Sequence, residues 1–276
     1  MDYITLSAIG LTMGFFGGLL GIGGSAIMIP AMVFSFGENQ HLYQASAMIC
    51  NFVVGASSTL AHRKARALHK PVLKVMVPTA LIGILVGVTW SNSAMFSKGN
   101  SPLLARTFGV FLVYVAFYNA HKVICSLKRK KKVLRTDQEI RNTPWLSGVI
   151  GLGTGLAAGL LGIGAGTIAT PIQQLVLKMP MRRAMSNSAV TIMSIAWLGA
   201  LYKNATLGQH GISFEMFAQD NPVWISLKIA AIVAPTAFLG GFLGGHMMHK
   251  LPKNVVRGVF IVIVVLAAIR LLTVKS

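Results

Sequence analysis

Apolar residues run almost continuously along this chain, and short polar segments separate the runs. An α-helix needs about 20 apolar residues to cross roughly 30 Å of hydrocarbon. Runs of that order with few or no charges lie at 43–61, 72–91, 103–121, 184–202, 229–248 and 254–269. Two further runs, 3–36 and 145–177, are longer, and a continuous helix over 3–36 would measure about 50 Å. Neither of these two runs is therefore predicted to be one plain membrane span.

Each long run contains a glycine-rich break, and the two breaks resemble each other. Residues 18–30 read GLLGIGGSAIMIP and residues 159–171 read GLLGIGAGTIATP, with eight of the thirteen aligned positions identical. Residues 77–83 also resemble residues 234–240. Two matching copies in one apolar chain indicate an internal duplication, as in many membrane transporters. We divide the chain into a first membrane repeat at 1–124, a basic linker at 125–144 and a second membrane repeat at 145–276.

The breaks also account for the excess length of the two long runs. If each run is a helical hairpin that leaves the membrane on the side it entered, the two halves have opposite orientations. This arrangement places more lysine and arginine on the side of the linker than simple crossings do, as the positive-inside rule favours. We therefore predict an all-α polytopic membrane protein with two inverted repeats, each a broken helical hairpin plus three transmembrane helices. Eight simple spans are the alternative.

Composition and charge agree with a lipid environment. The chain is 54% apolar and 11% charged, whereas soluble domains carry about 25% charged residues. The net charge of +19 comes from 25 basic and 6 acidic residues, and the basic ones cluster between the apolar runs. Membrane topology and contact with anionic lipid headgroups explain this better than nucleic-acid binding, so no nucleic-acid partner is expected. The linker at 125–144 is predicted to be cytoplasmic.

Other features restrict the function further. The N-terminus has no basic n-region, so a secretory signal peptide is not expected. Cys50 and Cys125 lie in or beside apolar runs and fit no metal spacing. No nucleophile with a base, and no set of metal ligands, falls at membrane depth, so neither an enzyme nor a cofactor is predicted. The acidic residues lie at the termini or in loops, which disfavours a cation site: Asp2, Glu38, Asp137, Glu139, Glu215 and Asp220.

The glycine breaks predict an internal cavity, because irregular backbone at membrane depth is tolerated only within protein or beside water. A new helix near Ser25 and near Thr167 would begin with unpaired amide groups and about half a positive charge. Such a helix start suits a small anion without requiring a buried lysine. The candidate substrate-binding residues here are Gly23, Gly24, Ser25, Gly164, Gly166 and Thr167. The alternative is that the glycines only permit close packing or a tight turn.

Polar residues in the neighbouring runs are the second group of candidates. An amide side chain facing lipid is costly, so it either pairs with another helix or contacts a ligand. This group consists of Asn51, Ser186, Asn187 and Ser188.

The motifs at 14–30 and 155–171, supported by the small-residue segments at 78–87 and 235–245, resemble the TauE/SafE family of sulfite exporters. The resemblance covers essentially the whole chain. It implies secondary transport of a small sulfur-containing anion, such as sulfite, thiosulfate or an organosulfonate, across the bacterial inner (cell) membrane. Because no ATP-binding motif is present, an ion or substrate gradient would drive alternating access. An anion channel and a non-transporting membrane scaffold are the alternatives. The direction of flux, the coupling ion and assembly into a homo-oligomer stay open.

Overall fold

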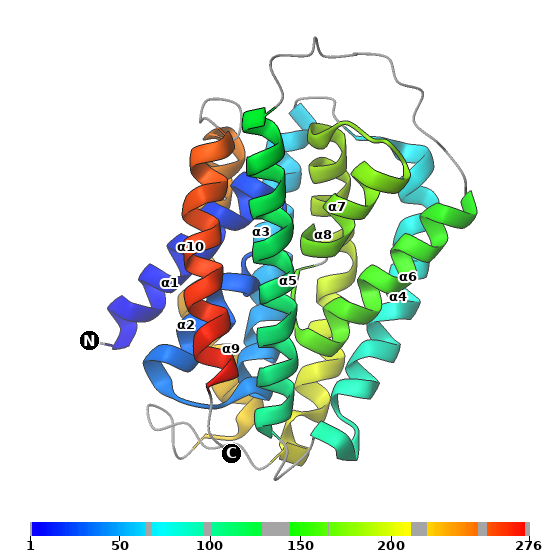
Figure 1. Ribbon diagram of the computed structural model, residues 1–276. Helices are drawn as coiled ribbons and strands as arrows, with labels where there is room; N and C mark the ends of the chain where they lie inside the picture. The colour runs from blue at the N-terminus through cyan, green and yellow to red at the C-terminus, as the bar shows by residue number, and fades with distance from the viewer. Residues whose placement is uncertain are drawn as a thin grey trace.

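The computed structural model describes residues 2–64, 68–96, 101–128, 144–164, 166–210, 220–247 and 253–273, which form a bundle of helices (Figure 1). The first half contains α1 (Asp2–Leu20), α2 (Ser25–Phe36), α3 (Gln40–Lys64), α4 (Lys70–Ser91) and α5 (Ser101–Lys128). The second half contains α6 (Pro144–Leu161), α7 (Gly166–Val176), α8 (Met181–Thr206), α9 (Pro222–Met247) and α10 (Lys253–Leu272). Short 3-10 turns follow α4 and α8, namely η1 (Ala94–Phe96) and η2 (Leu207–His210).

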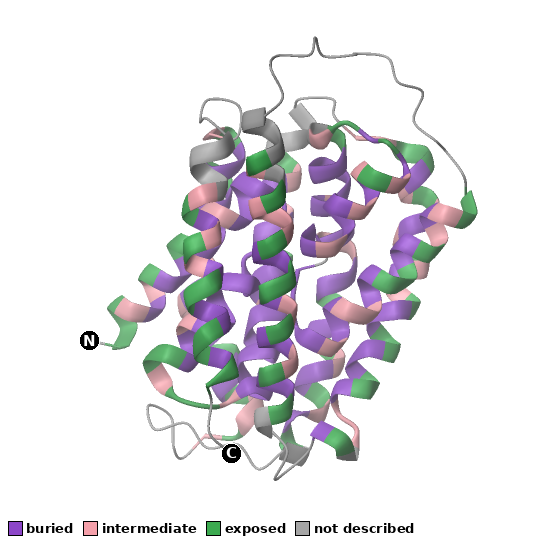
Figure 2. Cartoon of the chain, viewed as in Figure 1, coloured by how far each residue is buried: buried purple, intermediate pink, exposed green. Residues whose placement is uncertain are grey.

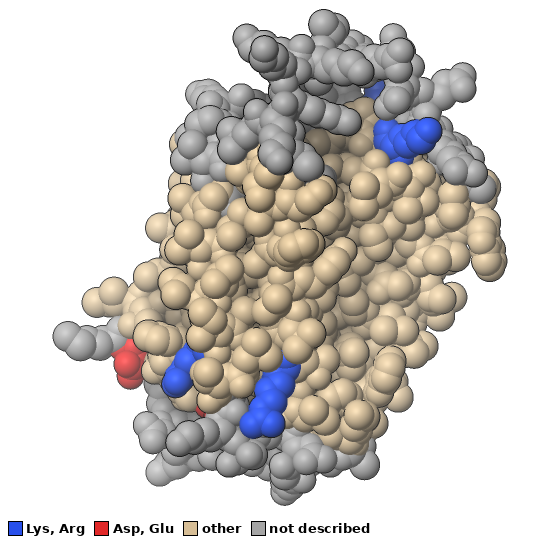
Figure 3. All heavy atoms as spheres, viewed as in Figure 1, with Lys and Arg blue, Asp and Glu red and all other residues tan. Residues whose placement is uncertain are grey.

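The described helices have the lengths and surfaces of a membrane protein. Six of them, α1, α4, α6, α8, α9 and the central part of α5, are long and apolar enough to cross a bilayer. Figure 2 shows buried residues along the inner faces of the helices and exposed ones along the outer faces. Many exposed residues are large and apolar, and Figure 3 shows the described charged residues only toward the two ends of this face. The prediction of an all-α polytopic membrane protein is confirmed.

Both long apolar runs are interrupted where the sequence predicts a break. The α1 helix ends at Leu20 and the α6 helix at Leu161, and each is followed by a short irregular segment. Gly21, Gly23 and Gly162 in these segments have positive φ angles of 62°, 77° and 70°, which are readily adopted only by glycine. In Figure 1, α2 and α7 turn back toward the ends of the molecule at which α1 and α6 begin. The breaks therefore reverse the chain, as the hairpin prediction requires.

Two helix pairs repeat the same close packing, α1 with α9 and α6 with α4. Gly14 lies against Ala237 of α9, and Gly155 lies against Ala80 of α4; in both places an added Cβ would collide with a backbone carbonyl group. Such close approach of backbones holds helices together in lipid, where the hydrophobic effect does not. Other glycines with four-residue spacing make equivalent contacts in these pairs: Gly18, Gly83, Gly87, Gly159, Gly240 and Gly244.

Helices that correspond in the two halves run in opposite directions. Gly55 of α3 lies against Met193 of α8, whereas Gly199, further along α8, lies against Met48, earlier in α3. The α5 and α10 helices also pack on each other, with the first part of α5 against the end of α10. The α3–α8 and α5–α10 pairs are therefore antiparallel, and the inverted repeat itself stays a prediction.

Some boundaries differ from the sequence-based expectation. The α9 helix begins at Pro222, before the predicted run at 229–248, so Lys228 lies within the helix. Proline is well suited to the first position of a helix, and Lys228 reaches the surface, where Nζ lies 2.6 Å from Asp220 Oδ2. Residues 129–143, most of the predicted linker, lie outside the described residues. Cys50 is buried with a free thiol, and the Cys125 side chain also lies outside them.

Replacing Gly155 by alanine should destabilise the protein, because the added Cβ would lie against the Ala80 carbonyl group and push α4 and α6 apart. We expect a cost of about 1–3 kcal/mol, typical of overpacking. Gly153 is a matched control on the same helix, since nothing lies within 4 Å of an added Cβ there. Gly153→Ala should be neutral, or stabilising by up to about 1 kcal/mol. Thermal unfolding of both variants in detergent is the measurement, and equal midpoints would contradict the packing argument.

Candidate functional site

The two glycine breaks meet inside the bundle. Gly23 and Gly164, which occupy aligned positions in the two motifs, face each other so closely that a Cβ added to either would lie 2.6 Å from the Cα atom of the other. Gly166 likewise lies against the carbonyl group of Gly21. A side chain at any of these positions would force the two segments apart. The breaks from the two halves thus form one crossing, which we call the glycine crossing (residues 21–24, 162–164 and 166).

Ser25 and Asn51 hold the glycine crossing together. The Ser25 backbone N–H donates to Asn51 Oδ1 (3.3 Å), and Asn51 Nδ2 donates to Ser25 Oγ (2.9 Å). Ser25 Oγ also accepts a hydrogen bond from the backbone N–H of Gly164 (2.8 Å), and Asn51 Nδ2 reaches the Gly162 carbonyl oxygen at 3.5 Å. Ser25 is 0% exposed and Asn51 is 2% exposed. Protein groups therefore satisfy the start of α2 in this conformation.

The start of α7 is held differently. The α7 helix begins at Gly166, which aligns with Ser25, and Thr167 Oγ1 donates to the Gly164 carbonyl oxygen (3.0 Å). The residue of α8 that aligns with Asn51 is Ile192. An isoleucine has no polar atom with which to cap a backbone amide group. The two half-helix starts are therefore unequal, although their glycine motifs match.

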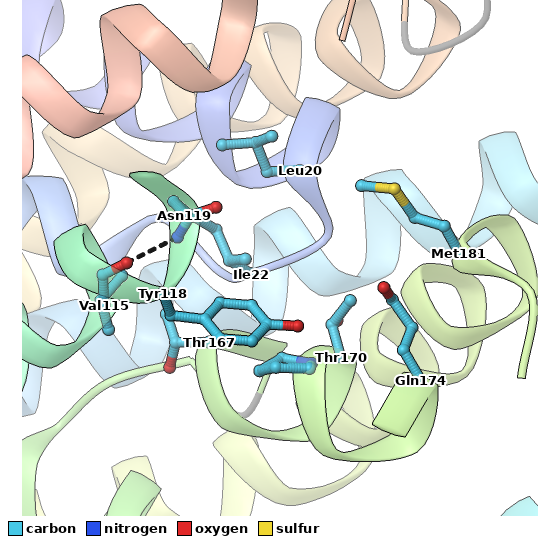
Figure 4. A pocket seen from close by; sticks show the side chains of 10 residues that line it. Leu20, Ile22, Val115, Tyr118, Asn119, Thr167, Thr170, Gln174 and Met181 are labelled. Atoms are coloured by element: carbon cyan, nitrogen blue, oxygen red, sulfur yellow. Dashed lines mark hydrogen bonds between the residues drawn. The ribbon is translucent and has the colours of Figure 1, made fainter. Parts of the chain in front are cut away.

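A cavity of about 30 Å³ lies beside the start of α7 (Figure 4). Its polar lining comes from Thr167, Thr170 and Gln174 of α7 and from Tyr118 and Asn119 of α5. In Figure 4 the Tyr118 side chain reaches from α5 toward Thr170. The remaining lining residues are apolar: Leu20, Ile22, Val115, Pro171 and Met181. The cavity thus offers hydroxyl and amide groups and contains no carboxylate.

The corresponding place in the first half is covered by a helix. The α10 helix packs against α2, and in the part of the chain that the structure describes no comparable packing joins α5 to α7. Since α5 and α10 are the fifth helices of the two halves, the halves differ in this contact. The cavity lies on the α7 side of the glycine crossing.

The other predicted residues lie in α8. Ser188 supports α7, because Thr170 Oγ1 and Gln173 Nε2 both donate to its Oγ (2.9 and 3.3 Å). Ser186 is fully buried. Asn187 is not brought to the glycine crossing; its Oδ1 accepts from the backbone N–H of His69 (2.9 Å) just before α4. Burial, reinforced by the Arg183 charge, lowers the pKa of the His69 imidazole.

Sequence reasoning missed the cavity residues Tyr118, Asn119, Thr170 and Gln174. One signal was present, because Gln173 and Gln174 stand in an apolar run at positions where the first half has Met32 and Val33. The α5 residues gave none, since an isolated tyrosine and asparagine near a span end are common at membrane interfaces.

Comparison with known proteins identifies the family. The family model described as "Sulfite exporter TauE/SafE" matches residues 6–271. The chain belongs to the TauE/SafE family. The resemblance noted in the glycine motifs is thereby confirmed, and the chain is a multi-pass membrane protein of a transporter family.

Its curated relatives are named as transporters. The chain is 26% identical to "Probable membrane transporter protein MamO" of Paramagnetospirillum magneticum, over 99% of this chain and 45% of that protein. It is 24% identical to "Probable membrane transporter protein YunE" of Bacillus subtilis, over 99% of this chain and 98% of that protein. A third relative, "Probable membrane transporter protein MJ0441" of Methanocaldococcus jannaschii, is 26% identical over 90% of this chain and 88% of that protein. The chain thus spans less than half the length of the MamO protein. No solved structure matches.

Replacing Asn51 by leucine should destabilise the glycine crossing, because the Ser25 amide group loses its acceptor at a buried site. We expect a loss of roughly 1–3 kcal/mol, the cost of leaving a buried polar group unpaired. Thr12→Val is the control, since the exposed Thr12 hydroxyl bonds only carbonyl groups of its own helix. Thermal unfolding in detergent measures both variants. An Asn51→Leu protein as stable as the control would argue against the capping role.

Proposed function

We propose that this chain is a secondary transporter that carries a small sulfur-containing anion, such as sulfite, thiosulfate or an organosulfonate, across the bacterial inner membrane by alternating access. Membership of the TauE/SafE family supports membrane transport and a sulfur-containing substrate. The observation that carries the proposal is the cavity beside the start of α7, which offers hydroxyl and amide groups where the broken helices meet.

The chemistry of this cavity suits an anion. The start of α7 contributes backbone N–H groups and about half a positive charge. Gln174 and Asn119 bring side-chain amide groups that can donate hydrogen bonds. A sulfur oxyanion is rich in acceptor oxygens, so donors are what it requires. A lining carboxylate would repel it, and the lining has none.

The size of the cavity implies that the protein moves during transport. A volume of about 30 Å³ holds only a few water molecules, each of which needs roughly 10–15 Å³. A larger anion therefore requires α5 and α7 to separate. On the other side of the glycine crossing, α10 packs against α2. The glycine segments between the half-helices can act as hinges for a second conformation, in which α10 separates from α2 and α5 packs against α7. Opening on one side together with closing on the other is alternating access.

Radiolabelled thiosulfate counterflow in proteoliposomes tests this proposal. A transporter shows saturable uptake that is accelerated by unlabelled anion trapped inside. A channel gives flux without counterflow, and a scaffold gives the same leak as protein-free vesicles; either outcome overturns the proposal. Sulfite and an organosulfonate, added as competitors, rank the substrates.

Gln174→Met should lower counterflow by about tenfold or more, because it removes an amide donor from the cavity and keeps a similar side-chain volume. A hydrogen bond to a charged group contributes about 1.5–3 kcal/mol, and roughly 1.4 kcal/mol corresponds to tenfold. Thr107→Val on α5 is the control, since its hydroxyl bonds only a carbonyl group of its own helix and should leave flux unchanged. Unaltered transport in Gln174→Met would remove this cavity from the substrate path.

A further inference from the structure

A lysine side chain lies fully buried near the end of α8. Lys203 is 0% exposed. Its Nζ lies 2.9 Å from His41 Nδ1, 2.8 Å from Ser91 Oγ and 2.7 Å from Asn92 Oδ1. Among the described residues, no carboxylate pairs with Lys203. An uncompensated charge inside a membrane protein is costly, and such residues mark ion or proton pathways by default. The predicted span at 184–202 stopped one residue before it.

The hydrogen-bond geometry limits Lys203 and His41 to one shared extra proton. His41 Nε2 lies 2.9 Å from the carbonyl oxygen of Phe96 in η1, and because a carbonyl oxygen only accepts, Nε2 carries a hydrogen. When Lys203 is charged, His41 is neutral and its Nδ1 accepts from the ammonium group. When His41 is charged, Nδ1–H donates to the neutral amine. In both forms the pair holds one extra proton. A second would set two N–H groups and two positive charges against each other.

We propose that His41 and Lys203 form a proton-binding site that couples anion transport to the proton gradient. The ligand is a single proton shared by two nitrogen atoms. This inference rests on the proposed transport function and names its coupling ion.

A chain of hydrogen bonds connects this site to the second glycine break. Ser91 Oγ accepts from Lys203 and donates to Gln44 Oε1 (3.2 Å), and Gln44 Nε2 donates to the Leu160 carbonyl oxygen (3.3 Å) at the end of α6. The Gln44 side chain also lies against Gly162, where an added Cβ would be 2.6 Å from its Cγ. When the proton leaves, the neutral amine exposes a lone pair, and the Ser91 hydroxyl turns to donate to it. Gln44 then loses that donor, so proton release acts on the hinge between α6 and α7.

Among the described residues that contact Lys203 Nζ, His41 is the one with a titratable side chain. Asn92 is fixed by its own bond from Nδ2 to Thr206 Oγ1 (2.8 Å). Glu38 lies on the surface just before α3. Its carboxyl group has a raised pKa, because partial burial outweighs the opposing charges of Arg270 and Arg106. The other titratable groups on the neighbouring helices do not contact Lys203. Tyr43 bonds Gly37, Tyr202 bonds Thr89, and Lys228 pairs with Asp220. Cys50 lies further along α3, and Lys70 and Lys74 lie at the opposite end of α4 from Ser91.

The test is thiosulfate uptake driven by a pH gradient, compared with counterflow at equal pH in the same proteoliposomes. Thiosulfate stays ionised across the working pH range, so its own titration does not contribute. The wild type should accumulate the anion under the gradient, lose the accumulation with a protonophore, and carry protons that an internal pH dye reports. Lys203→Met should retain counterflow and lose gradient-driven accumulation by at least tenfold. Lys228→Met, on the surface of α9, is the matched control and should behave as wild type.

His41→Gln is a second variant, because its amide can still donate to the Phe96 carbonyl oxygen and accept from Lys203, without titrating. It should fold and should flatten the pH dependence of uptake. Gradient-driven accumulation that persists in Lys203→Met overturns the proposal, as does an unchanged pH dependence in His41→Gln or wild-type counterflow with no response to the gradient.

Absence of counterflow in the wild type is a different failure, since it overturns the transport function and the coupling together. The proton site itself is then judged by ¹⁵N NMR of labelled histidine in detergent. A His41 Nδ1 signal that shifts in Lys203→Met supports the shared proton, and a signal unaffected at every pH refutes it.

Discussion

Backbone groups left unpaired by a broken helix must be satisfied within the protein, because lipid offers no partner. The whole architecture follows from how this chain meets that requirement. Two glycine segments are placed backbone to backbone, so that Gly164 donates its N–H to Ser25 and Asn51 bridges the two halves. The paired packing of α1 on α9 and of α6 on α4 brings both segments to this place. Small residues serve both purposes: they let the helices approach and they let the breaks touch.

The two halves have the same order of helices, but the starts of α2 and α7 are held differently, and the cavity lies beside only one of them. The α2 start is capped by Asn51, whereas the aligned α8 residue is Ile192 and supplies no cap. The α10 helix covers α2, whereas α5 leaves room beside α7 for the cavity. If the molecule were fully symmetric, both half-helix starts would be equally closed or equally open. A departure from symmetry in one conformation is what alternating access requires, since each side is open only when the other is shut.

The sequence predicted the elements that depend on local signals and missed those that depend on tertiary neighbours. Both breaks, the reversal of the chain and the glycine packing followed from residue pattern and span length. The starts of the two half-helices, expected near Ser25 and Thr167, lie at Ser25 and Gly166. Nothing local could show that Tyr118 of α5 would face α7. Lys203 stands just beyond the predicted span at 184–202, where a lysine usually reaches the interface, so its burial could not be predicted from the sequence.

The lining of the cavity contains no charged side chain, and Lys203 is buried elsewhere in the bundle. One electrostatic argument explains both observations. Moving an unaccompanied anion across the membrane exchanges about 2.3 kcal/mol per elementary charge per 100 mV with the membrane potential. A permanent cation in the cavity would hold the anion too strongly to release it, whereas donors and a helix start bind it without a fixed charge. A proton that binds at Lys203 and His41 and acts on the α6–α7 hinge through Ser91 and Gln44 offsets one negative charge of the anion without occupying its site. The charge needed for transport is then mobile, and the cavity stays neutral for entry and release.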